Sequence, residues 1–208
     1  MTNSPIVAVL AVQGAFIEHE QRLEALGATC IELRQARDLE QPFDALVLPG
    51  GESTVQAKLL HELGMFDTLK KKIEEGLPVL GTCAGLILLA RTIEKESGDM
   101  AGRDQSIAHV RTKVTGLGTM SVTVQRNAFG RQLGSFHASA QFAGTPNVPL
   151  TFIRAPYITQ VGKGADALCE VDGRVVAARY GNQLGVAFHP ELDNDNTVYS
   201  MFLSMIRR

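Results

Sequence analysis

The sequence predicts an α/β fold: a mostly parallel central sheet flanked by helices, with an antiparallel extension in the C-terminal half. In the first half of the chain, short apolar runs rich in β-branched residues alternate with segments of helical periodicity. This alternation is typical of a parallel sheet covered by helices on both faces. After residue 120, strand-like segments follow one another with few helices between them, which favours antiparallel pairing there.

Periodicity predicts each element of the first half. The first strand is the apolar run at 6–10, and the helix after it carries four side chains at helical spacing before Gly27: Phe16, His19, Leu23 and Leu26. The same two patterns then repeat. Further strands are expected at 29–33, 45–48 and 78–80, and further helices at 53–63, 66–75 and 86–91.

The second half is predicted to be richer in strands, which are expected at 120–124, 151–153, 174–179 and 183–187. A helix at 197–206 closes the chain, and Asn194, Asp195 or Asn196 is available as its N-cap. Between the halves, the stretch 95–118 is rich in Gly, Ser and charge and has little periodicity. We interpret it as a long surface loop or a partly disordered insertion.

Length and charge limit the classes of protein and partner. With 208 residues and 45% hydrophobic content, the chain is expected to form a single domain, 1–208, with the insertion at about 94–119. Its formal net charge of −2 predicts no binding to nucleic acid or to an anionic membrane. The apolar run 6–12 is too short to span a bilayer and no basic segment precedes it, so we expect a cytoplasmic protein.

The three cysteines lack the close spacings of zinc sites and redox pairs, so free thiols and no metal site are expected. Cys30 and Cys169 lie in apolar strand-like runs and are interpreted as buried structural cysteines. Cys83 has a different setting, because it lies at the junction between a predicted strand and a predicted helix.

The segment Gly81-Thr-Cys-Ala-Gly85 has the layout of a nucleophile elbow. A tight strand-to-helix turn around a nucleophile needs small residues on both sides, because the backbone is strained and neighbouring segments pack close. Gly81, Ala84 and Gly85 meet that need. The start of a helix favours a thiolate, and the Ala84 N–H can donate to an oxyanion. We therefore interpret Cys83 as a nucleophile rather than a structural cysteine.

His189 is the best candidate for the general acid that a thiolate needs when it expels an amine. It follows an apolar strand, and Pro190 biases it toward an extended backbone, so His189 and Glu191 can point the same way. Glu191 can then hold the imidazole in one tautomer. Alone, His-Pro-Glu is more often a loop with a solvated carboxylate, and the cysteine elbow favours the triad. The other histidines are interpreted as surface or packing residues (His19, His61) or lack an obvious carboxylate partner (His109, His137).

A second glycine-rich turn, Pro49-Gly-Gly-Glu52, lies between a predicted strand and a predicted helix. Its successive N–H groups can form an anion-binding nest and supply a second oxyanion donor. A phosphate-binding loop is the alternative, but the Gly-Lys-[Ser/Thr] ending is missing. Ser53 is expected to cap the following helix in either case.

Cys83, His189 and Glu191, in that chain order, resemble the triad of class I glutamine amidotransferases. More specifically, the chain resembles the glutaminase subunits of pyridoxal 5′-phosphate synthases over nearly its whole length. The segments that carry this resemblance are Ala11-Val-Gln-Gly-Ala-Phe16, Pro49-Gly-Gly-Glu-Ser-Thr54, Gly81-Thr-Cys-Ala-Gly-Leu86, Arg126-Asn-Ala-Phe-Gly-Arg131, Phe152-Ile-Arg-Ala-Pro156 and Phe188-His-Pro-Glu-Leu192. The fourth and fifth segments are the most specific.

The resemblance implies a three-layer α/β sandwich that hydrolyses L-glutamine to L-glutamate and ammonia without a cofactor. It also implies a synthase subunit as partner, which condenses the ammonia with a pentose phosphate and a triose phosphate. The glutamine-binding residues that it implies are Gly51, Glu52, Ser53, Arg126, Ile153 and Arg154. Gly51 and Ala84 are the expected oxyanion donors. The insertion at about 94–119 is longer than in compact members of the family.

Three alternatives remain open at this point. Another amidotransferase would keep the triad but lack the segments at 126–131 and 152–156. A cysteine peptidase or γ-glutamyl hydrolase would act without a synthase. A non-catalytic regulatory subunit would have no need for Cys83, His189 and Glu191 together.

Overall fold

The computed structural model describes residues 4–94, 112–113, 116–126 and 134–206. The main sheet consists of β1 (Ile6–Leu10), β2 (Thr29–Leu33), β3 (Ala45–Leu48), β4 (Val79–Thr82), β5 (Ala90–Glu94), β6 (Thr112–Lys113), β7 (Met120–Gln125), β10 (Tyr157–Val161), β11 (Ala165–Val171), β12 (Arg174–Tyr180) and β13 (Gln183–Val186). A separate hairpin pairs β8 (Ser135–Phe142) with β9 (Thr145–Ile153). The helices are α1 (Phe16–Ala25), α2 (Ser53–Glu62), α3 (Phe66–Glu74), α4 (Ala84–Leu89) and α5 (Thr197–Ser204), with 3-10 turns at Ala36–Glu40 and Pro190–Leu192.

The strand order of the sheet is β2-β1-β3-β4-β13-β12-β10-β7-β5-β6, and β11 pairs with β12. From β2 to β13 every neighbouring pair is parallel. Beyond β13 the pairs β13–β12, β12–β10 and β10–β7 are antiparallel, whereas β7–β5 is parallel. The predicted mostly parallel sheet with an antiparallel extension is thus confirmed.

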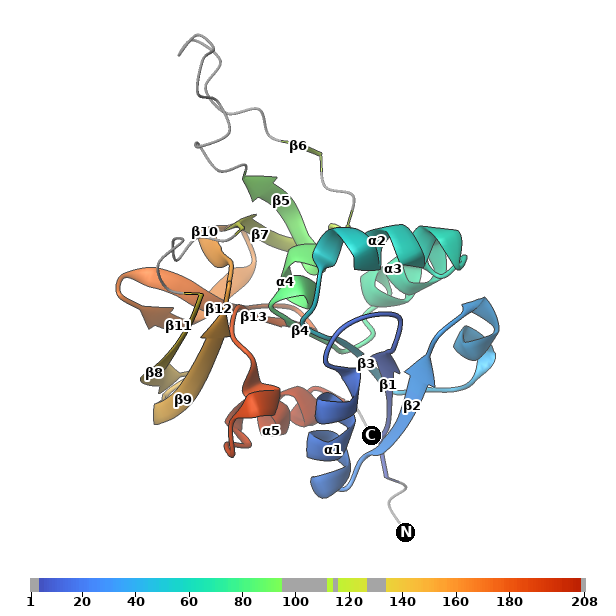
Figure 1. The fold of residues 1–208 in the computed structure, drawn as a ribbon, viewed down its shortest axis with the longest axis horizontal. Coiled ribbons are helices and arrows are strands. Elements are labelled where there is room, and N and C mark those ends of the chain that lie inside the picture. Colours follow the sequence, from blue (N-terminus) through green and yellow to red (C-terminus); the bar gives the residue numbers. More distant parts are fainter. Residues whose placement is uncertain (1–3, 95–111, 114–115, 127–133, 207–208) are drawn as a thin grey trace, which may run out of the picture.

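The parallel strands lie between two layers of helices (Figure 1). α2 and α3 lie on one side of β1, β3 and β4, and α1 and α5 lie on the other. All residues of β3 and β4 are buried, as expected for strands that helices cover on both faces. All residues of α4 are buried, whereas α3 buries one stripe, which consists of Leu69 and Ile73, four positions apart. The predicted three-layer α/β arrangement is therefore confirmed.

Several local predictions need correction. The helix expected at 86–91 is α4, which starts two residues earlier and ends at Leu89, where β5 follows directly. The strand expected at 151–153 is the end of the nine-residue β9. The N-cap of α5 is Asn196, but it is the Asp195 carboxylate that accepts a hydrogen bond from the Thr197 N–H at 2.8 Å.

The predicted surface loop at 95–118 falls mostly outside the described residues. Where the structure describes this stretch, the chain is packed against the fold. Thr112–Lys113 pair with β5, Leu117 is fully buried, and the Gly118 N–H donates to the Leu88 carbonyl at 3.2 Å. The part of the insertion that is described is therefore not a free surface loop.

Candidate active site

Four neighbouring parallel strands end at one edge of the sheet, and each leads into a segment singled out by the sequence. β3 leads into Gly50, β4 into Cys83 and β13 into His189, while β1 leads into the turn around Gly14. Open α/β sheets bind their ligands at the carboxyl ends of the strands. The topology thus gathers the candidate residues, which are up to 175 positions apart (189 minus 14), at one edge.

Cys83 occupies a strained turn between β4 and α4. Its backbone has φ 47° and ψ −97°, a conformation that costs a non-glycine residue about 1–3 kcal/mol. Glycines allow this turn to form. A Cβ on Gly85 would lie 1.9 Å from the Leu48 carbonyl oxygen, and one on Gly81 would lie 2.8 Å from the Gly85 backbone. The small neighbours of Cys83 are therefore needed for close packing, as the sequence predicted.

His189 and Glu191 are directly hydrogen-bonded. His189 Nδ1 lies 2.7 Å from Glu191 Oε1, and both residues are buried. Pro190 starts the 3-10 turn Pro190–Leu192, which returns the carboxylate to the ring. An ionised carboxylate accepts, so Nδ1 carries the proton and Nε2 is the nitrogen left for chemistry.

The electrostatics of the site favour a charged imidazole. Burial disfavours the charge on His189, but interaction with Cys83 and Glu191 outweighs burial and raises the His189 pKa to about 10. Burial also opposes ionisation of Glu191, yet the hydrogen bond from His189 leads the interactions that lower the Glu191 pKa overall. His189 Nε2 itself is buried and has no hydrogen-bond partner among the residues described.

Gly50 lies directly against the two residues that would react. A Cβ at this position would come within 2.5 Å of His189 Cε1 and 3.6 Å of Cys83 Cβ. The Gly50 carbonyl accepts a hydrogen bond from the Ala15 N–H at 3.2 Å. Gly50 thus brings the glycine-rich turn into contact with both Cys83 and His189.

Three of the predicted glutamine-binding residues lie together at the start of α2. Glu52 accepts hydrogen bonds from the Thr54 and Val55 N–H groups, so it caps α2 in place of Ser53, which is buried. Arg126 reaches across to this carboxylate, with Nη2 3.2 Å from Glu52 Oε1. Residues 127–131 of the motif that begins at Arg126 lie outside the described residues.

Ile153 and Arg154 approach the site from the end of β9. The Cys83 Sγ lies 3.9 Å from the Ile153 carbonyl oxygen. Arg154 is exposed and has φ 44°, and its N–H donates to the Gly134 carbonyl at 2.8 Å. The Ile153 carbonyl is therefore in direct contact with the nucleophile.

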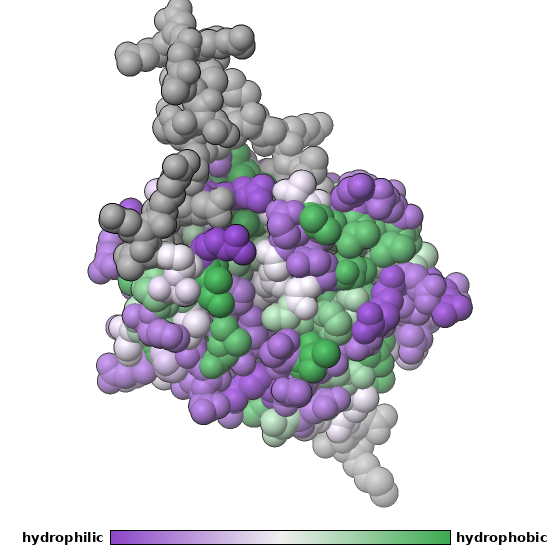
Figure 2. Space-filling view, in the orientation of Figure 1, coloured by the Kyte–Doolittle hydropathy of each residue, from purple (hydrophilic) through white to green (hydrophobic). Residues whose placement is uncertain are grey.

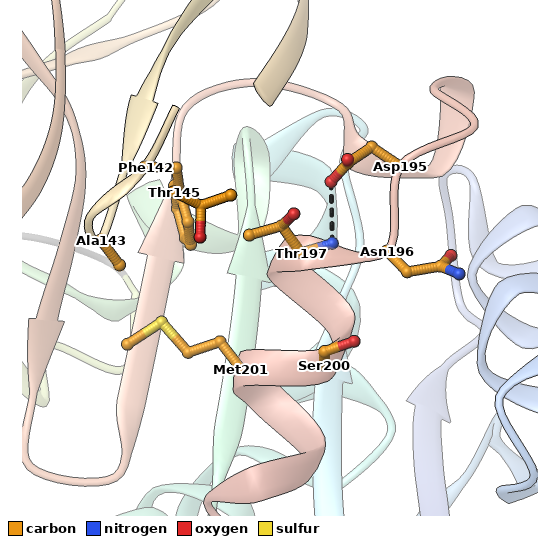
Figure 3. A pocket seen from close by; sticks show the side chains of 8 residues that line it. All are labelled: Phe142, Ala143, Thr145, Asp195, Asn196, Thr197, Ser200 and Met201. Atoms are coloured by element: carbon orange, nitrogen blue, oxygen red, sulfur yellow. Dashed lines mark hydrogen bonds between the residues drawn. The ribbon is translucent and has the colours of Figure 1, made fainter. Parts of the chain in front are cut away.

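A hollow of about 590 Å³ lies elsewhere, between α5 and the turn of the β8–β9 hairpin (Figure 3). Its lining combines apolar residues, Phe142 and Met201, with polar residues that include Asp195 and Ser200. It contains none of the triad residues. Chemistry rather than cavity size therefore identifies the candidate active site.

Comparisons with known proteins show the family of the chain. A family model described as the SNO glutamine amidotransferase family matches residues 9–208. The chain belongs to this family. Pyridoxal 5′-phosphate synthase subunits PdxT of Methanocorpusculum labreanum and Desulfitobacterium hafniense are 54% and 52% identical to it, over 96% of this chain and 97% and 92% of theirs. A crystal structure of a glutamine amidotransferase, 38% identical, has a TM-score of 0.82 and covers 96% of this chain and 98% of its own.

Membership of a glutamine amidotransferase family makes this chain an enzyme that acts on the side-chain amide of glutamine. Its sequence-predicted site is not complete, however. Gln13 was not predicted, although its side-chain carbonyl accepts from the Glu52 N–H at 2.8 Å. Gln56 was missed too, and its amide donates to the Gln13 and Pro49 carbonyls at 2.9 and 3.1 Å. These two amides hold the glycine-rich turn of the amidotransferase in place.

His19 was predicted to be a surface or packing residue; the surface alternative is wrong, and the polar partners of the ring were not predicted. It is completely buried, with Nε2 3.5 Å from Glu191 Oε2 and 3.1 Å from Thr82 Oγ1. Its Nδ1 lies 2.7 Å from the Tyr199 hydroxyl. The available signal was its place among the apolar positions of α1, because a histidine on a buried stripe needs polar partners.

We expect Gly14→Ala to disrupt the active-site turn of this amidotransferase. Gly14 has φ 109°, and a Cβ there would lie 1.9 Å from the Gly50 carbonyl oxygen. Overpacking and backbone strain together should lower stability by about 3 kcal/mol. This corresponds to a fall in Tm of about 9 °C, measured by calorimetry.

Gly27→Ala is the matched control for this substitution. Gly27 also has positive φ, 87°, but a Cβ there meets nothing within 4 Å. It should therefore cost only the backbone strain, about 1 kcal/mol, and leave glutaminase activity intact. Equal effects of the two substitutions on stability and activity would show that the Gly14–Gly50 approach is unimportant.

Proposed function

We propose that this amidotransferase is the glutaminase subunit of a pyridoxal 5′-phosphate synthase and hydrolyses L-glutamine through Cys83, His189 and Glu191. The observation that carries this proposal is the arrangement around His189. The ring is oriented by Glu191 at 2.7 Å, and its other nitrogen is buried. Cys83 interacts with His189 from a strained elbow, and both residues lie against Gly50. This is the geometry that a thiol nucleophile and its general base require.

The proposed reaction has two halves. The Cys83 thiolate attacks the amide carbon of glutamine, and the protonated Nε2 of His189 delivers its proton to the departing nitrogen. Ammonia leaves and a thioester remains on Cys83. A water molecule then gives its proton to His189 and attacks the thioester, which releases glutamate and returns the thiolate–imidazolium pair. The raised pKa of His189 supports a charged imidazole at neutral pH.

Two N–H groups are proposed as the oxyanion hole, those of Gly51 and Ala84. Ala84 immediately follows the nucleophile, as an oxyanion donor does at a nucleophile elbow. The peptide between Gly50 and Gly51 has its carbonyl held by the Ala15 N–H. If this peptide must rotate to aim the Gly51 N–H at the oxyanion, the isolated chain is poorly active and the synthase subunit activates it.

We propose that Glu52 and Arg126 recognise the two charged ends of the substrate, together with Gly51, Ser53, Ile153 and Arg154. Glutamine is a zwitterion, with one ammonium and one carboxylate on its α-carbon. The Glu52–Arg126 ion pair offers a charge of each sign, and Glu52 follows two residues after Gly50, which lies against Cys83 and His189. Interactions of Glu52 with the Thr54 and Val55 N–H groups and with Arg126 lower its pKa despite burial, so it is ionised at neutral pH.

Arg126→Met should raise the KM for glutamine about thirtyfold and change kcat little. The substitution removes a charge-assisted hydrogen bond to substrate, which is worth about 1.5–3 kcal/mol. Steady-state kinetics of glutamate release measure both constants. Arg179→Met is the control, because Arg179 lies on β12 and its Nε donates only locally, to the Gly181 carbonyl. A lower kcat with unchanged KM would contradict the binding role.

A synthase subunit is the proposed partner, in a hetero-oligomer that passes ammonia directly between the two active sites. Free ammonia is protonated in neutral water and is then no longer a nucleophile, which favours direct transfer. Two features of the surface support a protein partner here. Figure 2 shows hydrophobic patches over α2 and α3. Four large apolar side chains on segments that hold site residues are also exposed: Ile17, Val55, Ile153 and Leu192.

No described helix has the length and apolar character needed to cross a membrane. A cytoplasmic location, a single domain over 1–208 and independence of any cofactor stay predictions.

The proposed chemistry is tested by alkylation with a glutamine-like electrophile, followed by mass spectrometry of the labelled peptide. The adduct is expected on Cys83, and excess glutamine should protect it. Cys30 and Cys169 are internal controls, because burial raises their pKa values to about 12 and about 11 and keeps both thiols protonated. An unlabelled Cys83 would instead favour the non-catalytic regulatory subunit.

A further inference from the structure

A buried polar cluster lies behind the carboxylate of Glu191, on the side away from His189. Its members come from three elements: His19 from α1, Thr82 from the end of β4 and Tyr199 from α5. All three are completely buried. His19 is central, because its ring lies within hydrogen-bonding distance of both Thr82 and Tyr199 and 3.5 Å from Glu191.

The protonation of this cluster follows from its surroundings. Burial lowers the pKa of His19, more than the attraction of Glu191 raises it, so the ring is neutral at neutral pH and carries one N–H. Burial likewise raises the pKa of Tyr199, so its hydroxyl keeps its proton and can donate. A lone pair on Nε2 would be repelled by the carboxylate at 3.5 Å. The proton therefore lies on Nε2, and Nδ1 accepts from the Tyr199 hydroxyl.

Glu191 has one carboxylate oxygen for His189 and one that faces this cluster. Oε1 is bonded to His189 Nδ1, whereas Oε2 is buried and has no hydrogen-bond partner among the described residues. A buried carboxylate oxygen without a donor is costly, by about 1–3 kcal/mol or more. His19 Nε2 is the donor in reach, although it lies closer to Thr82 Oγ1.

We infer that His19 is a positioning residue for the triad: its Nε2–H supports Oε2 of Glu191, and the Tyr199 hydroxyl fixes the His19 tautomer that makes this possible. The donor is shared between Thr82 Oγ1 and Glu191 Oε2 and moves toward the carboxylate when negative charge is concentrated there. His19 thereby keeps the Glu191 carboxylate aligned with the His189 ring. The inference rests on the proposed glutaminase function.

Other charged groups near the cluster are few within the described chain. Glu191 faces His189 on one side and His19 and Tyr199 on the other. Glu18 acts on His19 from the same helix, in the direction opposite to burial. Arg22 lies over the Tyr199 ring, with Cζ 5.9 Å from its centroid, and donates to the Asp195 carbonyl and the Asn196 side chain. Apart from the Glu191 backbone N–H, His19 and His189 are the donors near this carboxylate among the described residues.

Three substitutions separate positioning from packing. His19→Leu removes the donor and keeps comparable bulk, whereas His19→Gln retains an N–H donor near the position of Nε2. Tyr199→Phe removes only the hydroxyl that fixes the tautomer. His61→Gln and Tyr180→Phe are matched controls; His61 stacks on Phe66 in α2–α3, and Tyr180 ends β12. Each variant is assayed for glutamate release with the synthase subunit present, from pH 6 to 10.5.

We expect His19→Leu to lower kcat about thirtyfold with KM nearly unchanged, because a displaced acid–base group slows chemistry more than binding. The alkaline limb of the pH profile should move to lower pH, since a displaced Glu191 supports the imidazolium less well. His19→Gln should restore most of kcat, and Tyr199→Phe should lower it about fivefold with the same pH shift. Both controls should match the wild type.

Two outcomes would overturn the inference. If His19→Leu and His19→Gln lose stability and activity equally with no shift of the pH profile, His19 is only a packing residue. If Tyr199→Phe has the kcat and pH profile of the wild type, the tautomer is not fixed by Tyr199. Absence of Cys83-dependent glutamate release by the wild type itself would instead remove the proposed function, which keeps the two failures distinct.

Discussion

Cys83→Ala is expected to abolish glutamate release, by a factor of about 10⁵ or more, because it removes the thiol that forms the thioester in the proposed reaction. Loss of a nucleophile in a catalytic triad removes nearly all of the catalysis that the triad supplies. The fold should survive, because alanine removes only the Sγ atom and the glycines on both sides of the turn keep their close packing. Calorimetric titration with glutamine should therefore still detect binding to the variant.

Cys169→Ala provides the control for the nucleophile. Cys169 is a buried residue of β11 in the antiparallel part of the sheet, so its loss should lower stability modestly and leave glutamate release unchanged. Substantial release by Cys83→Ala would mean that another group attacks the amide. In that case the assignment of the elbow as the active centre would be wrong.

Glu191→Gln should lower kcat about thousandfold, because the amide cannot stabilise the imidazolium and can place its NH₂ group against Nδ1, which favours the wrong tautomer. KM should change little, since Glu191 is buried behind His189 and has no place in the proposed glutamine pocket. A second readout follows from protonation. The pKa of His189, raised to about 10 in the wild type, should fall toward its ordinary value in the variant.

His189 and Glu191 both make the stability of the folded state depend on pH. His189 has a raised pKa in the folded state, so its contribution is full below about 6.5 and is lost as the pH rises through about 10. Glu191 has a lowered pKa, so its contribution is full above its ordinary range and is lost as the pH falls through its folded value. The wild-type Tm should therefore fall at both ends of the pH range.

The Glu191→Gln variant should show a flatter dependence of Tm on pH than the wild type, at both the acid and the alkaline end. Calorimetry from pH 4 to 10.5 and the ring-proton NMR signals of His189 measure the two effects. A His189 titration that is the same in wild type and Glu191→Gln would contradict the account of the pair.

The fold and the triad segments could be predicted because their signals are local. Strand–helix alternation, small residues around Cys83 and the His-Pro-Glu turn are each contained within a few positions. The β8–β9 hairpin was harder to predict from the sequence, because Pro146 and Pro149 interrupt the strand pattern of β9. Prolines are tolerated there because, among the described residues, the two-stranded sheet leaves one edge of β9 without ladder partners.

The contacts of His19 with Thr82, Tyr199 and Glu191 could not be predicted, because they join segments that are far apart along the chain. The polar partners of His19 are 63 and 180 positions away along the chain, and α1 periodicity shows only that the residue is buried. Likewise, Glu52 rather than Ser53 caps α2 because Arg126 and the turn around Gln13 hold Glu52 in that place. Local propensity alone favours serine there.

Glutamate release from glutamine by the wild-type chain, with and without a pyridoxal 5′-phosphate synthase subunit, tests the central claim most directly. We predict release that depends on Cys83 and that rises when the synthase is added. No release in any mixture would contradict the claim and point to a regulatory subunit or to another amide substrate. Equal release with and without the synthase would leave the chemistry intact and remove the proposed activation of the Gly50–Gly51 peptide by the partner.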